Sequence, residues 1–358
     1  MSSISRNRLN RFFRCGVVLL ALAIYGCGGG GGGNGASPPP PVVCDTSSAG
    51  GTPTTNRAYV TNVNSGTISV IDTTTNSVTA TITVGGAPAV VVAAPQSHRA
   101  FFTDLMSGNI SVVDTSTNTK LNPIVVGSVP LAGFGIDNTA HKLFAADFSD
   151  AAGNLGHLSV VNIPDCAVAT FSVGTKLQDI AVDATVGKAY VTDFGDGATG
   201  HGSVKVIQNS AVAATLTSTP KSTNSHGVAV DVSNDLLLVT NLGEKTVSIF
   251  TLSSGAFVTT IAVGNVPQSV DVYPAIHRAY VTNDSDGTVS VINTSNNTVV
   301  TTVTVGASPQ GIAVNTSSGM VYVTNETSGT VSVIDSSNNT VAATIPVGSH
   351  PVRVAVAS

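Results

Sequence analysis

The segment Tyr322-Val323-Thr324-Asn325 opens the unit of sequence that decides the fold of this chain. A turn containing Gly329 follows it, and then Thr330-Val331-Ser332-Val333-Ile334-Asp335, in which polar and apolar residues alternate. A polar turn at residues 336–339 separates this segment from a second alternating segment at residues 340–345. Alternation with a period of two fits β-sheets that pack face to face. The unit therefore predicts antiparallel strands joined by tight turns.

The four-residue motif recurs through the chain at nearly constant spacing. Its equivalents begin, in chain order, at Tyr59, Phe101, Phe144, Tyr190, Leu238, Tyr280 and Tyr322, with steps of 42, 43, 46, 48, 42 and 42 residues. Most units end in Val-Gly-x-x-Pro and a short apolar segment, which gives four short strands per unit. A repeat of this length with four strands is typical of a β-propeller blade. We therefore predict an all-β fold, a seven-bladed β-propeller of four-stranded antiparallel blades.

The seven units resemble the YVTN-family β-propeller repeat, and the resemblance covers residues 57–358. The resemblance implies the propeller fold and says little about activity. The first unit starts at Arg57 without an inner strand, whereas residues 348–356 read as an inner strand with no unit after it. Val356 also lies 34 residues after Tyr322, which is the phase of the other inner strands. We expect this C-terminal strand to join blade one and close the ring, which removes exposed strand edges.

Composition excludes several classes of protein. Only 10% of the 358 residues are Asp, Glu, Lys or Arg, against about 25% in typical soluble proteins. The chain has 36 Gly and no Trp, and its many Val and Thr residues favour strands over helices, which argues against a helical bundle. The formal net charge of -5 argues against a nucleic-acid partner, because proteins that bind nucleic acid usually carry a basic surface.

Residues 1–26 predict a bacterial lipoprotein signal peptide. Four arginines precede the apolar run GVVLLALAI at residues 16–24, which is too short to span a membrane stably. The run ends in Ile24-Tyr25-Gly26-Cys27, which resembles the lipobox whose cysteine is acylated. Tyr25 departs from the small residue that is usual there. The alternatives are a soluble secreted protein and an uncleaved anchor.

Residues 27–56 are expected to be the lipidated Cys27 and a tether. The run of Gly at residues 28–33 and the four Pro at residues 38–41 cannot bury enough apolar surface to fold. Gly28 is not the Asp that retains lipoproteins at the inner membrane, so the resemblance implies a lipid anchor in the bacterial cell envelope, at the outer membrane if the host has one. The expected state is a monomeric propeller, residues 57–358, held at a membrane.

Two cysteines remain once Cys15 leaves with the signal peptide and Cys27 carries lipid. Cys44 and Cys166 would then lie in a compartment where disulfides persist. A disulfide between them is one interpretation, and two unrelated thiols are the other. A zinc site is not expected, because such sites need about four ligands at close spacing.

Departures from the repeat indicate where a ligand would bind. We call top face the end of the ring that carries the turns after the four-residue motif, where the inner strands also begin. Blades two and three begin their inner strands with small residues, Ala89 and Ala132. The other blades place polar side chains there, namely Gln178, Asp179, His226, Gln268, Gln310 and Arg353. We predict a polar ligand site formed by these residues at the mouth of the central channel, and a solvated channel mouth is the alternative.

Two enlarged loops, residues 148–157 and 194–202, are expected on the same face. Long loops on a rigid scaffold commonly carry binding function. The predicted loop contacts are Asp150, His157, Asp196 and His201.

These features favour a non-catalytic binding or scaffold protein that presents its top face to a protein, a glycan or a small polar ligand and needs no cofactor. The first alternative is a lactonase-like hydrolase with calcium or zinc at the channel mouth. The predicted ring supplies one carboxylate, Asp179, whereas hard cations bind several oxygens. The chain also lacks a G-x-S-x-G nucleophile motif, so no catalytic residue or metal ligand is predicted. The second alternative is a structural subunit of a periplasmic complex.

Overall fold

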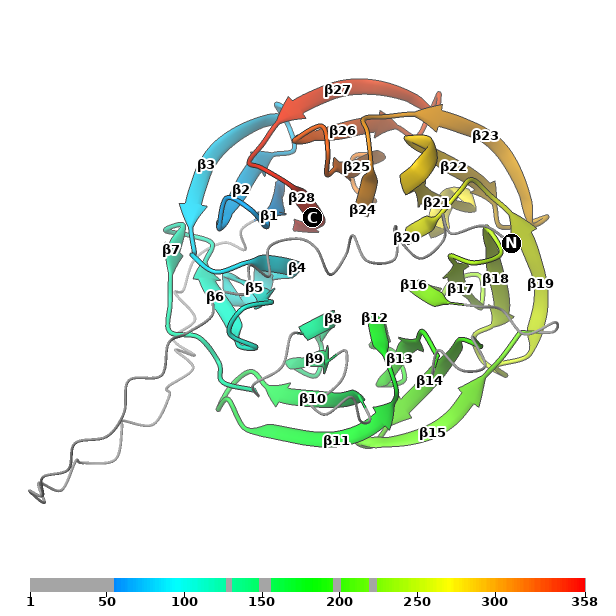
Figure 1. Ribbon diagram of the computed structural model, residues 1–358, viewed down its shortest axis with the longest axis horizontal. Helices are drawn as coiled ribbons and strands as arrows, with labels where there is room; N and C mark the ends of the chain where they lie inside the picture. The colour runs from blue at the N-terminus through cyan, green and yellow to red at the C-terminus, as the bar shows by residue number, and fades with distance from the viewer. Residues whose placement is uncertain (1–54, 127–130, 148–155, 196–200, 219–223, 358) are drawn as a thin grey trace, which may run out of the picture. The chain divides into compact units, whose positions relative to one another are not determined.

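The computed structural model describes residues 55–126, 131–147, 156–195, 201–218 and 224–357. In this part of the chain, 28 strands form seven four-stranded antiparallel sheets, and the only helices are three single 3-10 turns. Figure 1 shows the sheets as blades around a central axis, with one edge strand of each blade innermost. The predicted seven-bladed propeller is therefore confirmed. No helix of the described residues is long and apolar enough to cross a membrane.

The strands follow the chain from the inner to the outer edge of each blade. Blade one contains β28 (Pro351–Ala357), β1 (Arg57–Asn62), β2 (Thr67–Asp72) and β3 (Ser77–Thr83). Blade two contains β4 (Pro88–Ala94), β5 (Arg99–Asp104), β6 (Ile110–Asp114) and β7 (Thr119–Lys120). Blade three contains β8 (Leu131–Asp137), β9 (Lys142–Asp147), β10 (Gly156–Asn162) and β11 (Val168–Gly174). Blade four contains β12 (Leu177–Asp183), β13 (Lys188–Asp193), β14 (Ser203–Gln208) and β15 (Ala211–Leu216).

The last three blades repeat the same order. Blade five contains β16 (Ser225–Asp231), β17 (Leu236–Asn241), β18 (Thr246–Thr251) and β19 (Phe257–Ala262). Blade six contains β20 (Pro267–Tyr273), β21 (Arg278–Asn283), β22 (Thr288–Asn293) and β23 (Thr298–Thr304). Blade seven contains β24 (Pro309–Asn315), β25 (Met320–Asn325), β26 (Thr330–Asp335) and β27 (Thr340–Pro346). The 3-10 turns are η1 (Pro95–Ser97), η2 (Pro274–Ile276) and η3 (Asp284–Asp286).

The ring closes as the sequence predicts. β28 pairs antiparallel with β1, with Ala355 opposite Tyr59 and Ala357 opposite Arg57. In Figure 1 the red C-terminal strand β28 lies beside the blue strand β1. Blade one is thus built from both ends of the propeller, and its unfolding requires that they separate.

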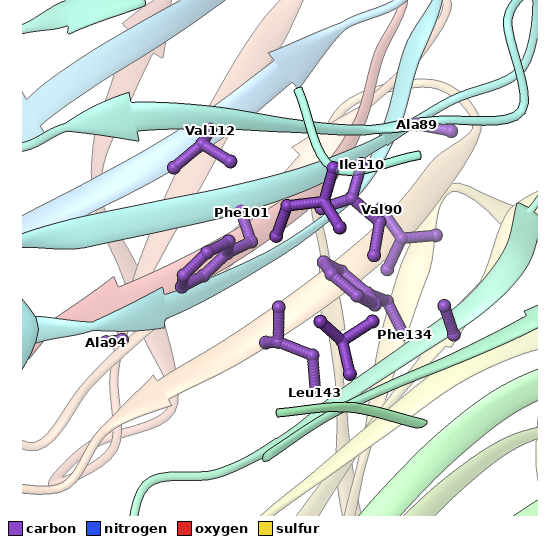
Figure 2. Packing of buried hydrophobic residues seen from close by; sticks show 11 residues of the cluster. Ala89, Val90, Ala94, Phe101, Ile110, Val112, Phe134 and Leu143 are labelled. Atoms are coloured by element: carbon purple, nitrogen blue, oxygen red, sulfur yellow. The ribbon is translucent and has the colours of Figure 1, made fainter. Parts of the chain in front are cut away.

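Apolar side chains fill the space between neighbouring blades. Figure 2 shows one such cluster, in which Phe101 and Val112 of blade two pack with Phe134 and Leu143 of blade three. Leu143 is fully buried and both phenylalanines are nearly so. Burial of each such side chain stabilises the fold by about 1.5–3 kcal/mol relative to its exposed state. Both faces of a middle strand are buried: Val331 and Val333 of β26 pack with blade one, and Ile334 packs with blade six.

The threonine of the repeated motif joins neighbouring blades. Each inner strand has a register shift near its start, between Ser225 and Val228 in β16 for example. The shift takes the Gly227 N–H out of the ladder, and this group donates to Thr240 Oγ1 at 2.7 Å. Thr240 Oγ1 in turn donates to the Gln268 carbonyl of blade six at 3.1 Å. One buried hydroxyl therefore satisfies two backbone groups that belong to different blades.

The turn before the second strand of each blade needs a left-handed residue. The residues at this position, which all have φ between 51° and 73°, are Asn56, His98, His141, Gly187, Asp235, His277 and Gly319. Gly, Asn, Asp and His tolerate this conformation better than other residues. The three histidines are therefore explained by turn geometry.

Candidate functional site

The register of the inner strands brings the predicted residues to one end of the ring. Pro267 and Pro309, the first residues of β20 and β24, lie opposite Asn283 and Asn325, the last residues of the motif strands. The second residues of four consecutive inner strands are consequently equivalent. They are Gln178, His226, Gln268 and Gln310. We call these four residues the polar arc.

Burial divides the predicted site residues into two groups. His226, Gln268 and Gln310 are 7%, 2% and 4% exposed, so they lie within the wall formed by the inner strands. Gln178, Asp179 and Arg353 are half-buried. A molecule that arrives at the top face would therefore reach the second group first.

Arg353 contacts two blades that are not its neighbours in the ring. Its Nη1 donates to Ser269 Oγ of blade six at 2.7 Å, and its Nη2 lies 3.8 Å from Asp179 Oδ2 of blade four. The side chain is 13% exposed, as is that of Asp179. Arg353 thus crosses the axis from blade one and links three blades.

Gly311 leaves room for strand β28, which carries Arg353. Gly311 of β24 lies against β28, and a Cβ atom at residue 311 would stand 2.6 Å from the Val352 carbonyl oxygen and 3.2 Å from Arg353 Cδ. Real Cβ atoms essentially never approach backbone atoms so closely. Only glycine therefore fits here without a shift of β28.

Asp179 ties blade four to blade five. Its Oδ1 accepts the Ile180 N–H at 3.0 Å, and the carboxylate also accepts the Val228 N–H of blade five. Burial raises the pKa of Asp179, while the positive charge of Arg353 opposes that rise.

Asp271 makes the equivalent link between blades six and seven. Its two oxygens accept the N–H groups of Val272 and Val314, each at 2.8 Å. Burial is the main cause that raises the pKa of Asp271 to about 6, and the negative charge of Asp179 adds to it.

The sequence-based prediction missed Asp271 and Glu326. Asp271 is the fifth residue of its inner strand, where the other six blades carry Ala355, Val92, Gly135, Ala181, Ala229 and Ala313. A single charge among small apolar residues was a visible signal. Glu326 Oε2 accepts a hydrogen bond from Gln310 Nε2 at 3.1 Å. This contact between the polar arc and the turn after β25 had no signal in the repeat pattern.

His226 is held as a neutral ring between blades five and six. Its Nδ1 lies 3.0 Å from the Gln268 carbonyl oxygen, which can only accept, so Nδ1 carries the proton. Burial, and secondly the positive charge of Arg353, lower the pKa of His226 to about 4. Beside it, Gln268 Oε1 is buried and has no hydrogen-bond partner among the described residues.

The remaining predicted residues are two described histidines, Cys166 and several residues outside the described part of the chain. His157 Nδ1 is 3.4 Å from Asp147 Oδ2 in its own blade, and His201 is exposed. Asp150, Asp196, Cys27 and Cys44 lie outside the described residues. Cys166, in the turn between β10 and β11, is disulfide-bonded, and because its partner is not described the pairing with Cys44 stays a prediction.

The described side chains contain no group of three or more His, Cys, Asp or Glu placed to hold a metal ion. The geometry at the axis instead shows carboxylates that accept backbone N–H groups and a guanidinium that joins blades. This arrangement can orient hydrogen-bond donors and acceptors toward the top face.

Comparison with known proteins identifies the fold and no family. No protein-family model and no curated protein matches this sequence. Among solved structures, a functionally unknown protein from Desulfotomaculum acetoxidans matches with a TM-score of 0.66 and 14% identity over 84% of this chain and 99% of that one.

Two enzymes of known structure are also similar in fold to this chain. Hydrazine synthase of Kuenenia stuttgartiensis matches with a TM-score of 0.60 and 18% identity, over 67% of this chain and 81% of that one. The dihydro-heme d1 dehydrogenase NirN matches with a TM-score of 0.58 and 12% identity, over 81% of this chain and 63% of that one. At such low identity the likeness shows the propeller fold alone, because one fold serves many functions.

Proposed function

We propose that this protein is a non-catalytic binding or scaffold propeller of the bacterial cell envelope. The observation that carries the proposal is the asymmetry of the top face, where polar residues begin the inner strands of blades four to seven and Arg353 follows in blade one, while blades two and three begin with small residues. A one-sided polar surface on a rigid ring is suited to hold one ligand in one orientation.

The bonds at the axis support binding rather than chemistry. Asp179 and Asp271 each accept N–H groups from two inner strands, and Arg353 is held by Ser269. Groups that join blades lose those bonds if they change protonation state or move during a reaction. These three residues therefore stabilise a rigid frame.

The chemistry of the half-buried groups indicates the class of ligand. Arg353 makes one side-chain hydrogen bond within the described residues, so its Nε and Nη2 groups can donate to an acceptor on a ligand. The amide of Gln178 offers both a donor and an acceptor. A neutral polar molecule with several hydroxyl or carbonyl groups, such as a glycan segment, matches this set better than an anion, which Asp179 and Asp271 would repel.

A glycan and small-molecule panel tested by calorimetry on the purified full chain would identify the ligand. We expect Gln178→Leu to weaken binding at least tenfold, because the leucine removes the half-buried amide. Gln208→Leu is the matched control, since Gln208 ends strand β14 of the same blade and is also half-buried. Equal effects of the two substitutions would contradict a site at the polar arc.

The hydrolase alternative predicts a different result. Purified protein would contain stoichiometric calcium or zinc and would hydrolyse lactones, and Asp179→Asn and Asp271→Asn would abolish the hydrolysis. That outcome would replace the binding function with a catalytic one.

The proposed location rests on the lipobox-like segment that ends at Cys27. In a bacterial host fed with labelled palmitate, we expect the full chain to be labelled and to fractionate with membranes. Cys27→Ser should remove the label and release the protein. Unchanged membrane fractionation of Cys27→Ser would contradict lipid anchoring.

A further inference from the structure

The residue that follows each four-residue motif forms a second ring of equivalent positions on the top face. We call these residues the rim, and within the described part of the chain they are Val63, Leu105, Phe194, Leu242, Asp284 and Glu326. The backbone N–H of each rim residue donates, at 2.9–3.2 Å, to a carbonyl in the connection that enters the inner strand of the same blade. Each rim residue is therefore fixed beside the start of an inner strand.

A contact in blade seven shows where a rim side chain reaches. The Glu326 N–H donates to the Ser308 carbonyl at 2.9 Å, and Glu326 Oε2 accepts a hydrogen bond from Gln310 Nε2 at 3.1 Å. Gln310 is the polar-arc residue of the same blade and lies two residues after Ser308. The backbone bond of the rim thus brings a rim side chain to the polar arc.

Blade four pairs an aromatic rim residue with the most accessible amide of the polar arc. The Phe194 N–H donates to the Lys176 carbonyl at 2.9 Å, the same bond that Glu326 makes in blade seven. Gln178 lies two residues after Lys176, so Phe194 lies beside Gln178. Both side chains are half-buried, whereas the other three residues of the polar arc are buried. A ligand that reaches the Gln178 amide therefore also meets the Phe194 ring.

Asp193 holds the backbone on both sides of this aromatic residue. Its Oδ1 accepts the Lys176 N–H at 3.1 Å and the Gly195 N–H at 3.2 Å, and it also accepts the Thr175 hydroxyl at 2.9 Å. Asp193 is only 5% exposed, so solvent competes little for these bonds. The backbone at Phe194 is ordered before a ligand arrives, which lowers the entropic cost of binding.

The chemistry of the rim differs between the two sides of the ring. The described rim residues are apolar on blades one, two, four and five, and they are the acids Asp284 and Glu326 on blades six and seven. Carboxylates accept hydrogen bonds from hydroxyl groups and repel anions. The face of a phenyl ring carries partial negative charge and attracts C–H groups, whose hydrogens are slightly positive. A neutral pyranose ring has a C–H face and a hydroxyl edge, so it matches both sides.

We propose that Phe194 is the stacking platform for a neutral pyranose residue whose hydroxyl groups bond to Gln178. The inference rests on the proposed binding function and narrows the ligand to a neutral glycan with a ring face, which excludes acyclic polyols. Phe194 determines specificity in this site, because it distinguishes a ring from an open chain that carries the same hydroxyl groups.

The chain contains no Trp, so Phe194→Trp introduces a single fluorescent reporter at the site. The purified full chain is titrated with neutral oligosaccharides of glucose, mannose and N-acetylglucosamine. We expect the variant to bind one of these series at least as tightly as the wild type does. Its emission should shift to shorter wavelength at saturation, because a stacked sugar ring excludes water from the indole.

Calorimetry with the same oligosaccharide measures the contribution of the aromatic face. Phe194→Ala should weaken binding at least tenfold, and Phe194→Leu, which keeps apolar bulk in the fold, should also weaken it. Leu105→Ala is the matched control, since Leu105 is the rim residue of blade two and lies beside Ala89, which offers no amide. This control should keep the affinity within twofold. Sorbitol, which has hydroxyl groups but no ring, should not bind.

The outcomes separate this inference from the function on which it rests. If the wild type binds none of the oligosaccharides, both the glycan ligand and the platform are wrong. If Gln178→Leu weakens binding while Phe194→Ala and Phe194→Leu bind as the wild type does, only the platform is wrong. An unchanged emission of Phe194→Trp at saturation, or binding of sorbitol with equal affinity, would also overturn the role of Phe194.

Discussion

At the scale of the residue, the packing around the central axis rests on a few specific contacts. In these contacts one side chain fits because its neighbour is small or carries the opposite charge. Arg353 reaches Ser269 and Asp179, and Gly311 lets β28 lie close to β24 while it does so. Gln268 contributes its backbone carbonyl to both Thr240 and His226. Individual substitutions at the axis should therefore affect more than one blade.

We expect Gly311→Ala to destabilise the protein by about 1–3 kcal/mol, as overpacking does in other tightly packed interiors. The added methyl group would meet the Val352 carbonyl and the Arg353 Cα atom at 2.6 and 2.8 Å. Urea unfolding followed by circular dichroism measures the change. Gly187→Ala is the control: Gly187 has open space around its Cβ position and φ of 62°, so only the left-handed conformation costs free energy. A smaller loss in Gly311→Ala than in Gly187→Ala would contradict this packing.

We expect His226 to stay neutral until the pH falls to about 4, because burial and the charge of Arg353 lower its pKa. The folded pKa lies below the unfolded value near 6.5, so the folded state binds fewer protons in this window. Stability is therefore lost as the pH falls from about 6.5 to about 4. NMR titration of the imidazole measures the pKa directly.

Asp271 changes the stability of the protein with pH in the opposite direction to His226, over an overlapping pH range. The pKa of Asp271 in the folded state, about 6, lies above its usual value. The contribution of Asp271 to the free energy of unfolding therefore falls as the pH rises from about 4 to about 6. His226→Gln and Asp271→Asn should separate the two contributions. Arg353→Met should raise the pKa of His226, and an unchanged pKa in that variant would show that Arg353 does not act on the histidine.

At the scale of the element, the motif strands do more than fill the interior. In five blades the motif threonine donates to an inner-strand carbonyl of the next blade. In the four blades whose motif ends in asparagine, that side chain donates to the next strand of the same blade. Asn283 Nδ2, for example, donates to Thr288 Oγ1 and Ser290 Oγ at 3.1 and 2.9 Å, and its Oδ1 accepts the Gly264 N–H of the connection from blade five. The repeated motif therefore encodes contacts both within and between blades.

Thr240→Val should lower the free energy of unfolding by about 1–3 kcal/mol, because it leaves the buried Gly227 N–H and part of the bonding of the Gln268 carbonyl unsatisfied. Thr103→Val is the matched control, since Thr103 is equally buried but, among the described residues, bonds through its hydroxyl to the Val90 N–H alone. Urea unfolding of both variants gives the comparison. Equal losses would mean that the bond between blades adds nothing.

At the scale of the whole molecule, stability depends on the closure of the ring. β28 pairs with β1 and supplies Arg353, so the last strand both completes blade one and links it to blades four and six. Six of the outer strands carry no charged residue, and Lys120 of β7 is the only charge in the seven outer strands. Uncharged strand edges favour association with other chains, so loss of closure would expose a further edge of the same kind.

A chain that ends at residue 350 should lose the cooperative unfolding transition and form oligomers, because β1 becomes an unpaired inner edge. Light scattering coupled to size-exclusion chromatography measures the association, and circular dichroism the transition. Arg353→Met keeps β28 and should remain monomeric with a lower transition temperature. A monomeric, cooperatively unfolding truncated chain would show that the ring does not need β28.

The sequence by itself determined the blades, their number and the way in which the ring closes. This was possible because strand alternation and turn residues are local features of the sequence. The same pattern also recurs in seven aligned units, so each unit supports the same prediction. It also brought out Gln178, His226, Gln268 and Gln310 as equivalent departures from the repeat. What it could not supply was the burial of three of these side chains.

Only the tertiary structure decided which groups meet at the axis. Arg353 and Ser269 are separated by 84 residues and belong to blades that are not neighbours, and Asp271 acts through the N–H of a strand in the next blade. A comparison of repeats treats each blade separately, so it contains no information on contacts across the ring. Those contacts arise because seven similar sheets close on themselves and bring their inner strands around one axis.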